Sequence, residues 1–198
     1  TMEAYAAAHL GKVKVGNEEY EPFMGDALTV NGYLGSDGIN PLIKVCKEND
    51  KGIFVLVKTS NPSSGELQDL LIDGVPVYER IGNMCEKWGE ELPGKYGYSG
   101  VGAVVGATYP EQIAELRKKL PHTFFLIPGY GAQGATAKDI AAAFDANGLG
   151  GIVNSSRGIM TAYKKEGCDE HDFAGAAFRE ALRMRDEIMG FVGKIQLP

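Results

Sequence analysis

Two turns in the sequence carry the residue types that bind an anion. Residues 126–136 (LIPGYGAQGAT) run through three glycines into a helix start, and residues 151–158 (GIVNSSRG) end in two serines, Arg157 and a glycine. Glycines let backbone N–H groups approach an anion closely, and a guanidinium can bind phosphate oxygens in pairs. Together the turns predict one phosphate site. Taken singly, a glycine turn could be a plain connector and Arg157 a surface ion-pair partner.

A third polar cluster follows another apolar segment. Residues 58–65 (KTSNPSSG) offer small hydroxyl and amide groups, of which Ser60 and Asn61 suit hydrogen bonding to a flat polar ring. The alternative is a turn whose later serines cap a helix. Lys58 could form a Schiff base if it were desolvated. Strand alternation leaves the direction of its side chain open, and we favour a non-catalytic Lys58.

Short apolar segments alternate with helical patterns along the chain. The predicted strands are rich in β-branched or aromatic residues and bounded by Gly, Pro, Asn or Ser. They cover residues 27–31, 53–57, 101–106, 123–127 and 151–154. The predicted helices cover residues 40–48, 66–91 with a break at 74–76, 110–120, 136–146 and 172–192. This alternation predicts a parallel sheet in an α/β fold.

The order of these elements predicts part of a (β/α)8 TIM barrel. Such barrels commonly bind phosphate in the loops after strands seven and eight, where the two turns fall if the visible strands are the last five. A full barrel takes about 250 residues, whereas this chain has 198 and opens in Thr1–Leu10, which reads as a helix already under way. We expect residues 1–198 to form a single domain, the C-terminal part of a barrel that lacks roughly three N-terminal units.

A Rossmann-like or flavodoxin-like sheet is the fold alternative. No Gly-x-Gly-x-x-Gly follows the first predicted strand, however, and paired loops after the last two strands suit a barrel better.

The predicted helices carry start signals and apolar faces. Thr136 and Asp139 fit a capping box. In the last helix the apolar residues recur at three- and four-residue steps; they are Phe173, Ala177, Phe178, Ala181, Leu182, Ile188 and Val192. We expect Met184 and Met189 to fill the core rather than to hold a cofactor.

The composition argues against several classes of partner. The formal charge of −6 and the pI near 5.2 provide no bulk attraction to nucleic acid or anionic lipid. We read no membrane-spanning run and no export signal. Three histidines and three cysteines lack the spacings of a metal site or a disulfide framework. We expect a cytoplasmic protein with no metal site, no nucleic-acid partner and no membrane partner.

The motifs together resemble orotidine 5′-phosphate decarboxylase, in particular its longer bacterial subgroup. The matching segments are 28–35 (LTVNGYLG), 55–62 (VLVKTSNP), 127–134 (IPGYGAQG) and 152–158 (IVNSSRG), in the family's order over nearly the whole chain. The resemblance implies the C-terminal portion of a TIM-barrel enzyme. That enzyme converts orotidine 5′-monophosphate to uridine 5′-monophosphate (UMP) in de novo pyrimidine biosynthesis, with no cofactor.

The resemblance also implies roles for particular residues. The family's serine after the fifth strand, which holds the pyrimidine, falls on Ser60. Its glutamine in the seventh loop, which bridges ring and phosphate, falls on Gln133, and Pro128 would border the same pocket. The family's arginine after the eighth strand falls on Arg157, which would clamp the 5′-phosphate together with backbone amides around Ser156.

The family's catalytic Asp-x-Lys-x-x-Asp array is nowhere in these residues. In the family its lysine stabilises a carbanion-like centre at C6 of the pyrimidine and delivers the proton, in a preorganised, water-poor site. A threonine that follows the array reaches the neighbouring subunit's site, which implies a homodimer, and Thr1 would be that residue. We predict that the isolated chain cannot decarboxylate, although the intact protein can.

Two other functions stay open on the residues alone. One is another phosphate-binding barrel enzyme, such as a sugar-phosphate aldolase with Lys58 as its Schiff-base nucleophile. The other is a non-catalytic nucleotide-binding or scaffold protein in which the glycine turns persist and no lysine array ever existed.

Overall fold

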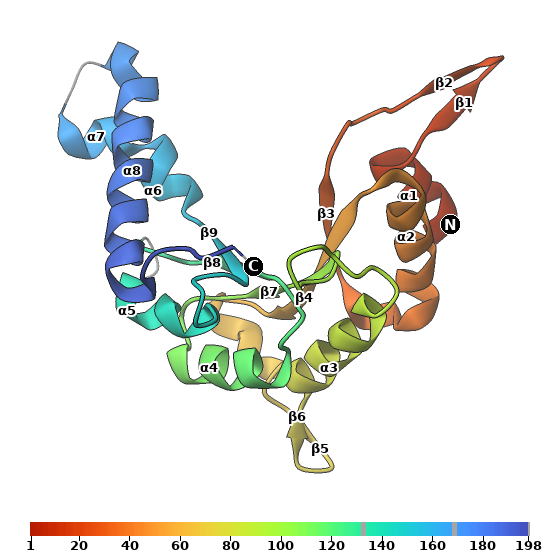
Figure 1. Cartoon of the computed structure of the whole chain (residues 1–198), viewed down its shortest axis with the longest axis horizontal. Coiled ribbons are helices and arrows are strands. Elements are labelled where there is room, and N and C mark those ends of the chain that lie inside the picture. Colours follow the sequence, from red (N-terminus) through yellow and green to blue (C-terminus); the bar gives the residue numbers. More distant parts are fainter. Residues whose placement is uncertain (132–133, 168–169, 198) are drawn as a thin grey trace.

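The core of the chain is a parallel sheet of five strands. The computed structural model describes residues 1–131, 134–167 and 170–197. The sheet runs in the order β3-β4-β7-β8-β9 (Figure 1), and every neighbouring pair is parallel. Its strands are β3 (Ala27–Val30), β4 (Gly52–Lys58), β7 (Val101–Val105), β8 (Phe125–Pro128) and β9 (Gly151–Asn154). The predicted strands and their parallel arrangement are confirmed.

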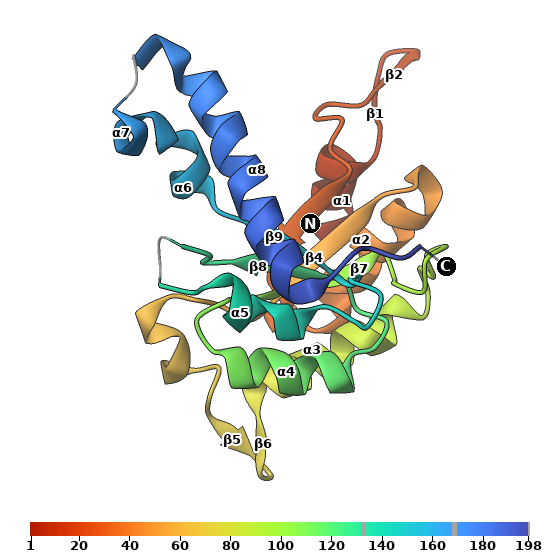
Figure 2. The same cartoon turned by 60° about the vertical axis from the view of Figure 1, so that its left-hand side comes forward.

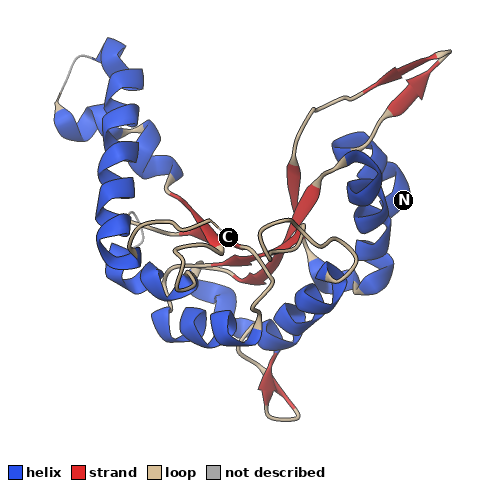
Figure 3. Cartoon of the chain, in the orientation of Figure 1, coloured by secondary structure: helices blue, strands red, loops and turns tan. Residues whose placement is uncertain are grey.

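The helices lie outside the curve of the sheet, as Figures 1 and 3 show. They include α2 (Ser36–Asn49), α3 (Val77–Gly89) and α4 (Pro110–Lys119). Along β4 the side chains of Ile53, Val55 and Val57 are buried, whereas Phe54 and Leu56 are only half-buried. Since alternate strand residues point to opposite faces, the outward face packs against the helices and the inward face stays partly open.

The sheet does not close on itself within the described residues. β3 pairs only with β4, and β9 pairs only with β8. On the inward face Ile152 of β9 keeps 53% of its surface exposed. An open, curved, parallel sheet with helices on its outer side is the architecture expected of an incomplete barrel.

The predicted helix over residues 66–91 is wrong in its first half. A 3-10 turn, η2 (Pro62–Glu66), leads into the hairpin β5 (Leu71–Ile72) and β6 (Val75–Pro76), and only then does α3 begin. Asp73 and Gly74 have φ angles of 51° and 76°. These left-handed conformations make a two-residue hairpin turn and cannot continue a right-handed helix.

Other predicted helices differ mainly in length. α2 starts at Ser36 rather than residue 40, with Pro41 inside its first turns. The helix expected over residues 136–146 is only α5 (Ala137–Ile140) followed by the 3-10 turn η3 (Ala141–Ala143), although the capping box of Thr136 and Asp139 is confirmed. The helix expected at Thr1–Leu10 is confirmed as α1 (Met2–Leu10).

Several short elements were not predicted. They are the exposed hairpin β1 (Val13–Val15) and β2 (Glu18–Tyr20), the 3-10 turns η1 (Gly32–Leu34) and η4 (Glu170–Asp172), and the helices α6 (Ser156–Met160) and α7 (Ala162–Glu166). Each is too short to show a full hydrophobic period in the sequence.

The last helix, α8 (Phe173–Val192), has the expected bounds but not the expected burial. Met184 is buried at 4% exposure, as predicted, but Met189 is 37% exposed, and Phe173 and Phe178 are 59% and 65% exposed. The reason is visible in Figures 1 and 2: α8 extends past the sheet and packs along one side against α5, α6 and α7. The expectation that Met189 fills the core was wrong.

A partly buried arginine joins the amino ends of β8 and β9. Arg117 of α4 donates from Nη1 to Gly150 O at 3.1 Å and from Nη2 to Thr123 O at 2.8 Å and to Leu120 O. Its guanidinium centre lies 4.1 Å from the centroid of the Phe125 ring. Burial lowers the pKa of Arg117 from its ordinary value. Carbonyl oxygens and aromatic faces offset part of this cost of burying the cation.

We predict that Arg117→Met lowers the free energy of unfolding by roughly 2–4 kcal/mol, because Thr123 O loses its donor among the described residues and Gly150 O and Leu120 O each lose one of two. Urea unfolding monitored by circular dichroism measures the change. The matched control is Arg185→Met, since Arg185 is 58% exposed and pairs only with its neighbour Asp186 among the ion pairs of the described residues. Equal losses in the two variants would contradict the structural role of Arg117.

Candidate functional site

The carboxyl ends of four strands are joined into one edge. Gly106 N, just after β7, donates to Lys58 O at the end of β4 at 2.7 Å. Ala107 N donates to Pro128 O at the end of β8 at 2.8 Å, and Pro128 pairs in register with Asn154 at the end of β9. Loops that follow parallel strands meet at this edge, which is where barrel enzymes place their active sites.

A cavity of about 190 Å³ lies at the β8–β9 end of this edge. It is lined by Pro128, Gly129, Tyr130, Asn154, Ser155, Ser156 and Arg157. Ser155, only 8% exposed, donates from Oγ to Tyr130 O at 3.0 Å and so joins the two turns. The glycine turn and the serine-arginine turn, which the sequence predicted to converge, therefore border one cavity.

The predicted phosphate-site residues occupy this cavity in part. Ser156 and Arg157 are exposed residues in the first turn of α6, and Pro128 is half-buried at the end of β8. Within the described part of the chain, the guanidinium of Arg157 has no carboxylate partner. Gln133 lies outside the described residues. The arrangement offers a free cation, hydroxyls and glycine backbone to a small anion.

Asn154 lines the same cavity, and the sequence analysis did not predict it as a site residue. Its Oδ1 is buried and has no hydrogen-bond partner among the described residues. A buried acceptor without a partner costs about 1–3 kcal/mol, so this amide is available to a bound group or an ordered water. The only signal in the sequence was its place at the end of a predicted strand.

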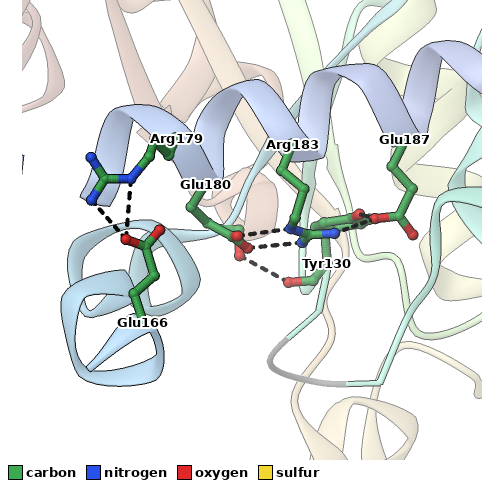
Figure 4. A network of polar contacts seen from close by, with 7 residues as sticks. Tyr130, Glu166, Arg179, Glu180, Arg183 and Glu187 are labelled. Carbon is green, nitrogen blue, oxygen red and sulfur yellow. Dashed lines mark hydrogen bonds and ion pairs between the residues drawn. The ribbon is translucent and has the colours of Figure 1, made fainter. Parts of the chain in front are cut away.

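Tyr130 is a second missed residue, and it anchors the glycine turn to α8. It is 4% exposed, and its hydroxyl donates to Glu187 Oε2 at 2.7 Å. Arg183 donates to the same Glu187 oxygen at 2.6 Å and makes a bidentate pair with Glu180 at 2.8 Å for each bond. Figure 4 shows how these side chains of α8 meet Tyr130. The network fixes one wall of the cavity.

The network shifts the pKa values of its members. Burial, followed by the hydrogen bond to Glu187, raises the pKa of Tyr130 to about 12. The same hydrogen bond, followed by that of Arg183, lowers the pKa of Glu187 from its ordinary value of 4.5. At neutral pH Tyr130 is therefore a neutral donor and Glu187 an ionised acceptor.

Ser60 and Thr1 stand apart from the small cavity. Ser60 is half-buried just beyond β4, and β7 and β8 lie between that strand and β9. Three strand spacings span roughly 14 Å on a flat sheet and less on a curved one. A ligand that reached both Ser60 and Arg157 would thus be extended, with a polar ring at one end and an anion at the other. Thr1 is the exposed N-cap of α1, and its side chain makes no capping hydrogen bond.

Lys58 is engaged elsewhere. Its side chain is completely buried, its Nζ lies 2.7 Å from Asp69 Oδ1, and the ammonium sits 4.7 Å from the centroid of the Tyr109 ring. Lys58 does not line the cavity of Arg157. A side chain that is buried and already paired with a carboxylate is not open to a substrate, so the geometry favours the non-catalytic Lys58 that we preferred from the sequence.

A larger groove of about 1180 Å³ lies between α2 and α3, bordered by Lys44, Lys47 and Lys87. None of its lining residues lies at the joined ends of β4, β7, β8 and β9, and we do not place the functional site there. In the described ranges, no group of three or more His, Cys, Asp or Glu side chains is arranged to hold a metal ion. Nor does any described helix combine the length and apolar character that crossing a bilayer requires.

Comparison with known proteins identifies relatives over nearly the whole chain. The model of the orotidine 5′-phosphate decarboxylase / HUMPS family matches residues 14–167. The chain is 46% identical over 194 residues to the orotidine 5′-phosphate decarboxylase of Rhodopirellula baltica, which covers 96% of this chain and 63% of that protein. The enzyme of the same name from Caldicellulosiruptor bescii is 48% identical over 188 residues, with 95% and 61% covered. The chain thus spans less than two thirds of the length of these relatives.

Solved structures agree with the fold. The UMP synthase of Leishmania donovani superimposes with a TM-score of 0.72 at 31% identity, over 95% of this chain and 36% of that one. The OMP decarboxylase of the same organism superimposes with a TM-score of 0.64 at 30% identity, over 89% of this chain and 63% of that one. The predicted resemblance and the predicted fold class, an incomplete α/β barrel, are confirmed.

The Tyr130–Glu187 contact predicts a pH-dependent contribution to stability. Because the pKa of Glu187 is lowered on folding, its contribution is present above the ordinary value and is lost as the pH falls through the lowered one. Tyr130→Phe should cost about 1 kcal/mol at pH 7, allowing for solvent screening. That cost should be smaller near pH 3.5, below the ordinary pKa of 4.5, than at pH 7.

Urea unfolding at the two pH values measures this difference. Tyr33→Phe is the control, since Tyr33 is 79% exposed, and it should change nothing at either pH. A Tyr130→Phe cost that is the same at both pH values would show that the Glu187 carboxylate is not the partner that matters.

Proposed function

Because the chain belongs to the orotidine 5′-phosphate decarboxylase / HUMPS family, we propose that the whole protein decarboxylates orotidine 5′-monophosphate to UMP. The step would serve pyrimidine biosynthesis. The observation that carries the proposal beyond family membership is the convergence of the two predicted anion-binding turns on one small cavity. That cavity lies at the end of the sheet where a barrel enzyme binds phosphate.

The ligand would lie along the joined strand ends. Arg157, with backbone amides around Ser156, would bind the 5′-phosphate, and Ser60 would bind the pyrimidine. Gln133 would bridge ring and phosphate, with Pro128 at the border. This orientation of the ligand is supported by two groups that have no partner among the described residues. They are the guanidinium of Arg157 at one end and the hydroxyl of Ser60 at the other.

The chemistry would be cofactor-free and electrostatic. The reaction passes through a carbanion-like centre at C6, which an ammonium group stabilises and protonates in a preorganised site. No Asp-x-Lys-x-x-Asp array occurs in the sequence. We therefore propose that the residues of this chain bind and orient the nucleotide and that the isolated chain does not decarboxylate it. Thr1 would contribute to a neighbouring subunit's site.

Phosphate binding would contribute to the rate as well as to affinity. Each charge-assisted hydrogen bond contributes about 1.5–3 kcal/mol. Binding energy from a group remote from the reacting carbon can be used to close and desolvate the site, which lowers the barrier rather than only the KM. Arg157 would thus act at a distance from C6.

We propose a homodimer in the cytoplasm. An exposed apolar patch next to α1, made of Tyr20, Phe23 and Met24 at 49%, 65% and 76% exposure, supports a protein interface. The Phe23 ring stacks on His9 of α1 at 5.0 Å, so the patch is continuous with the helix that follows Thr1. Cys46 and Cys85 are buried free thiols, which fits a reducing compartment.

We predict that Arg157→Ala in the whole enzyme lowers kcat/KM by roughly 10²-fold or more, equivalent to about 3 kcal/mol. Steady-state decarboxylation of orotidine 5′-monophosphate, followed by its ultraviolet absorbance, measures the loss. Arg185→Ala, an exposed arginine of α8, is the control and should leave kcat/KM unchanged. Unchanged kinetics for Arg157→Ala would remove this residue from the site.

The proposed dimer predicts that the double substitution Phe23→Asp and Met24→Asp weakens self-association of the whole protein by at least ten-fold, because it places charges in an apolar contact. Sedimentation velocity over a concentration series measures the association constant. Tyr96→Asp, a change at a 44% exposed tyrosine outside the patch, should not alter it. A dimer as stable as the wild type would exclude this patch.

A further inference from the structure

The loop after β4 returns to that strand through two adjacent side chains. Gln68 contacts Thr59, and Asp69 pairs with Lys58. Adjacent loop residues thus hold adjacent strand-end residues, and the next residue of the strand end is Ser60. The contact of Gln68 with Thr59 is called the Thr59 clamp below.

The Thr59 clamp fixes both the backbone and the side chain of Thr59. Gln68 Oε1 accepts from Thr59 N at 2.9 Å, and Gln68 Nε2 donates to Thr59 Oγ1 at 2.8 Å. Thr59 Oγ1 in turn donates to Asn61 Oδ1 at 2.5 Å. The two residues that flank Ser60 are therefore joined to each other, and Gln68 holds one of them at two points.

The neighbouring strand β7 limits movement of the Ser60 backbone. Gly106 follows β7 and donates to Lys58 O at 2.7 Å. A Cβ added at Gly106 would lie 2.8 Å from both the N and the Cβ atoms of Ser60. This is closer than real Cβ contacts come, so the backbone of Ser60 rests directly on a glycine.

Gln68 is itself anchored. Its backbone N donates to Ser64 O at 2.9 Å, and its backbone O accepts from Tyr78 N, in the first turn of α3, at 3.0 Å. Next to it the Lys58–Asp69 pair has one fully buried partner. The clamp is therefore built on the sheet and on α3 rather than on a free loop.

We infer that Gln68 is a positioning residue that presents Ser60 to the base of the bound nucleotide. Ser60 makes no hydrogen bond to another described residue, so its hydroxyl is free, while its neighbours and its backbone contacts are fixed. A prearranged hydroxyl loses less entropy on binding, which raises affinity without a new contact. The inference rests on the proposed function, because it assumes that Ser60 meets a pyrimidine.

The test compares two ligands in the whole protein. UMP carries base and phosphate, whereas ribose 5-phosphate carries phosphate alone. Gln68→Ala should raise the Kd of UMP roughly ten-fold, equivalent to about 1.4 kcal/mol, and should leave the Kd of ribose 5-phosphate unchanged. Isothermal titration calorimetry measures both. Gln68→Glu keeps the acceptor for the Thr59 N–H but cannot donate to the Thr59 hydroxyl, whose one proton goes to Asn61. It should therefore raise the Kd of UMP by less than Gln68→Ala does.

Two further variants keep the test decisive. Thr59→Val removes the hydroxyl half of the clamp and keeps the backbone half. It should also raise the Kd of UMP and not that of ribose 5-phosphate, and it replaces Gln68→Ala if that variant does not fold. Gln196→Ala is the matched control, since Gln196 donates to Asn147 O through its backbone N, which the substitution keeps. It should change neither Kd.

The outcomes separate the inference from the proposed function. Equal weakening of UMP and ribose 5-phosphate would show a general structural role for Gln68 and overturn the inference, as would an unchanged Kd for UMP. If the wild-type protein bound UMP no more tightly than ribose 5-phosphate, the pyrimidine would contribute no affinity, and this result would instead contradict the proposed function.

Discussion

Parallel strand pairing with linked carboxyl ends is the constraint on which the rest of this structure depends. Parallel strands place every following loop at the same edge of the sheet. Here backbone hydrogen bonds from Gly106 to Lys58 and from Ala107 to Pro128 continue the pairing one step past the strands themselves. The polar residues that follow β4, β8 and β9 are therefore fixed relative to one another by the backbone. Their side chains need only local restraints to become a site.

The opposite edge of the sheet explains how those restraints can be local. Arg117 gathers carbonyl oxygens at the amino ends of β8 and β9, and its guanidinium packs against Phe125. The outward face is packed against helices, as the buried side chains of β4 show. With one edge and one face already fixed, loops at the carboxyl edge are free to carry polar groups that do not stabilise the fold. Serine and arginine side chains without internal partners are tolerated there.

The sequence predicted the sheet well because its signal is local. Each strand is a short apolar run rich in β-branched or aromatic residues, and each run is bounded by breakers. The prediction for residues 66–73 was wrong because it also relied on a local signal. Their apolar spacing suits a helix, whereas the left-handed conformations of Asp73 and Gly74 impose a hairpin. The motifs located both turns of the small cavity. The role of Tyr130 arises from a contact with Glu187, which is distant in the chain. Those of Gln68 and Asn154 arise from a loop that returns to a strand end and from the lining of a cavity, which no periodicity reveals.

The two ends of the candidate site are restrained by separate parts of the molecule. The end with Arg157 depends on Tyr130 and its network with α8, whereas the end with Ser60 depends on Gln68 and on Gly106. Among the described residues, no hydrogen bond or ion pair joins these two sets of restraints directly. A ligand that touches both ends is then the element that couples them, and each end can be tuned without disturbing the other. Under the proposed function, binding energy gained at the phosphate helps to keep the pyrimidine next to Ser60, whose position is set before the ligand binds.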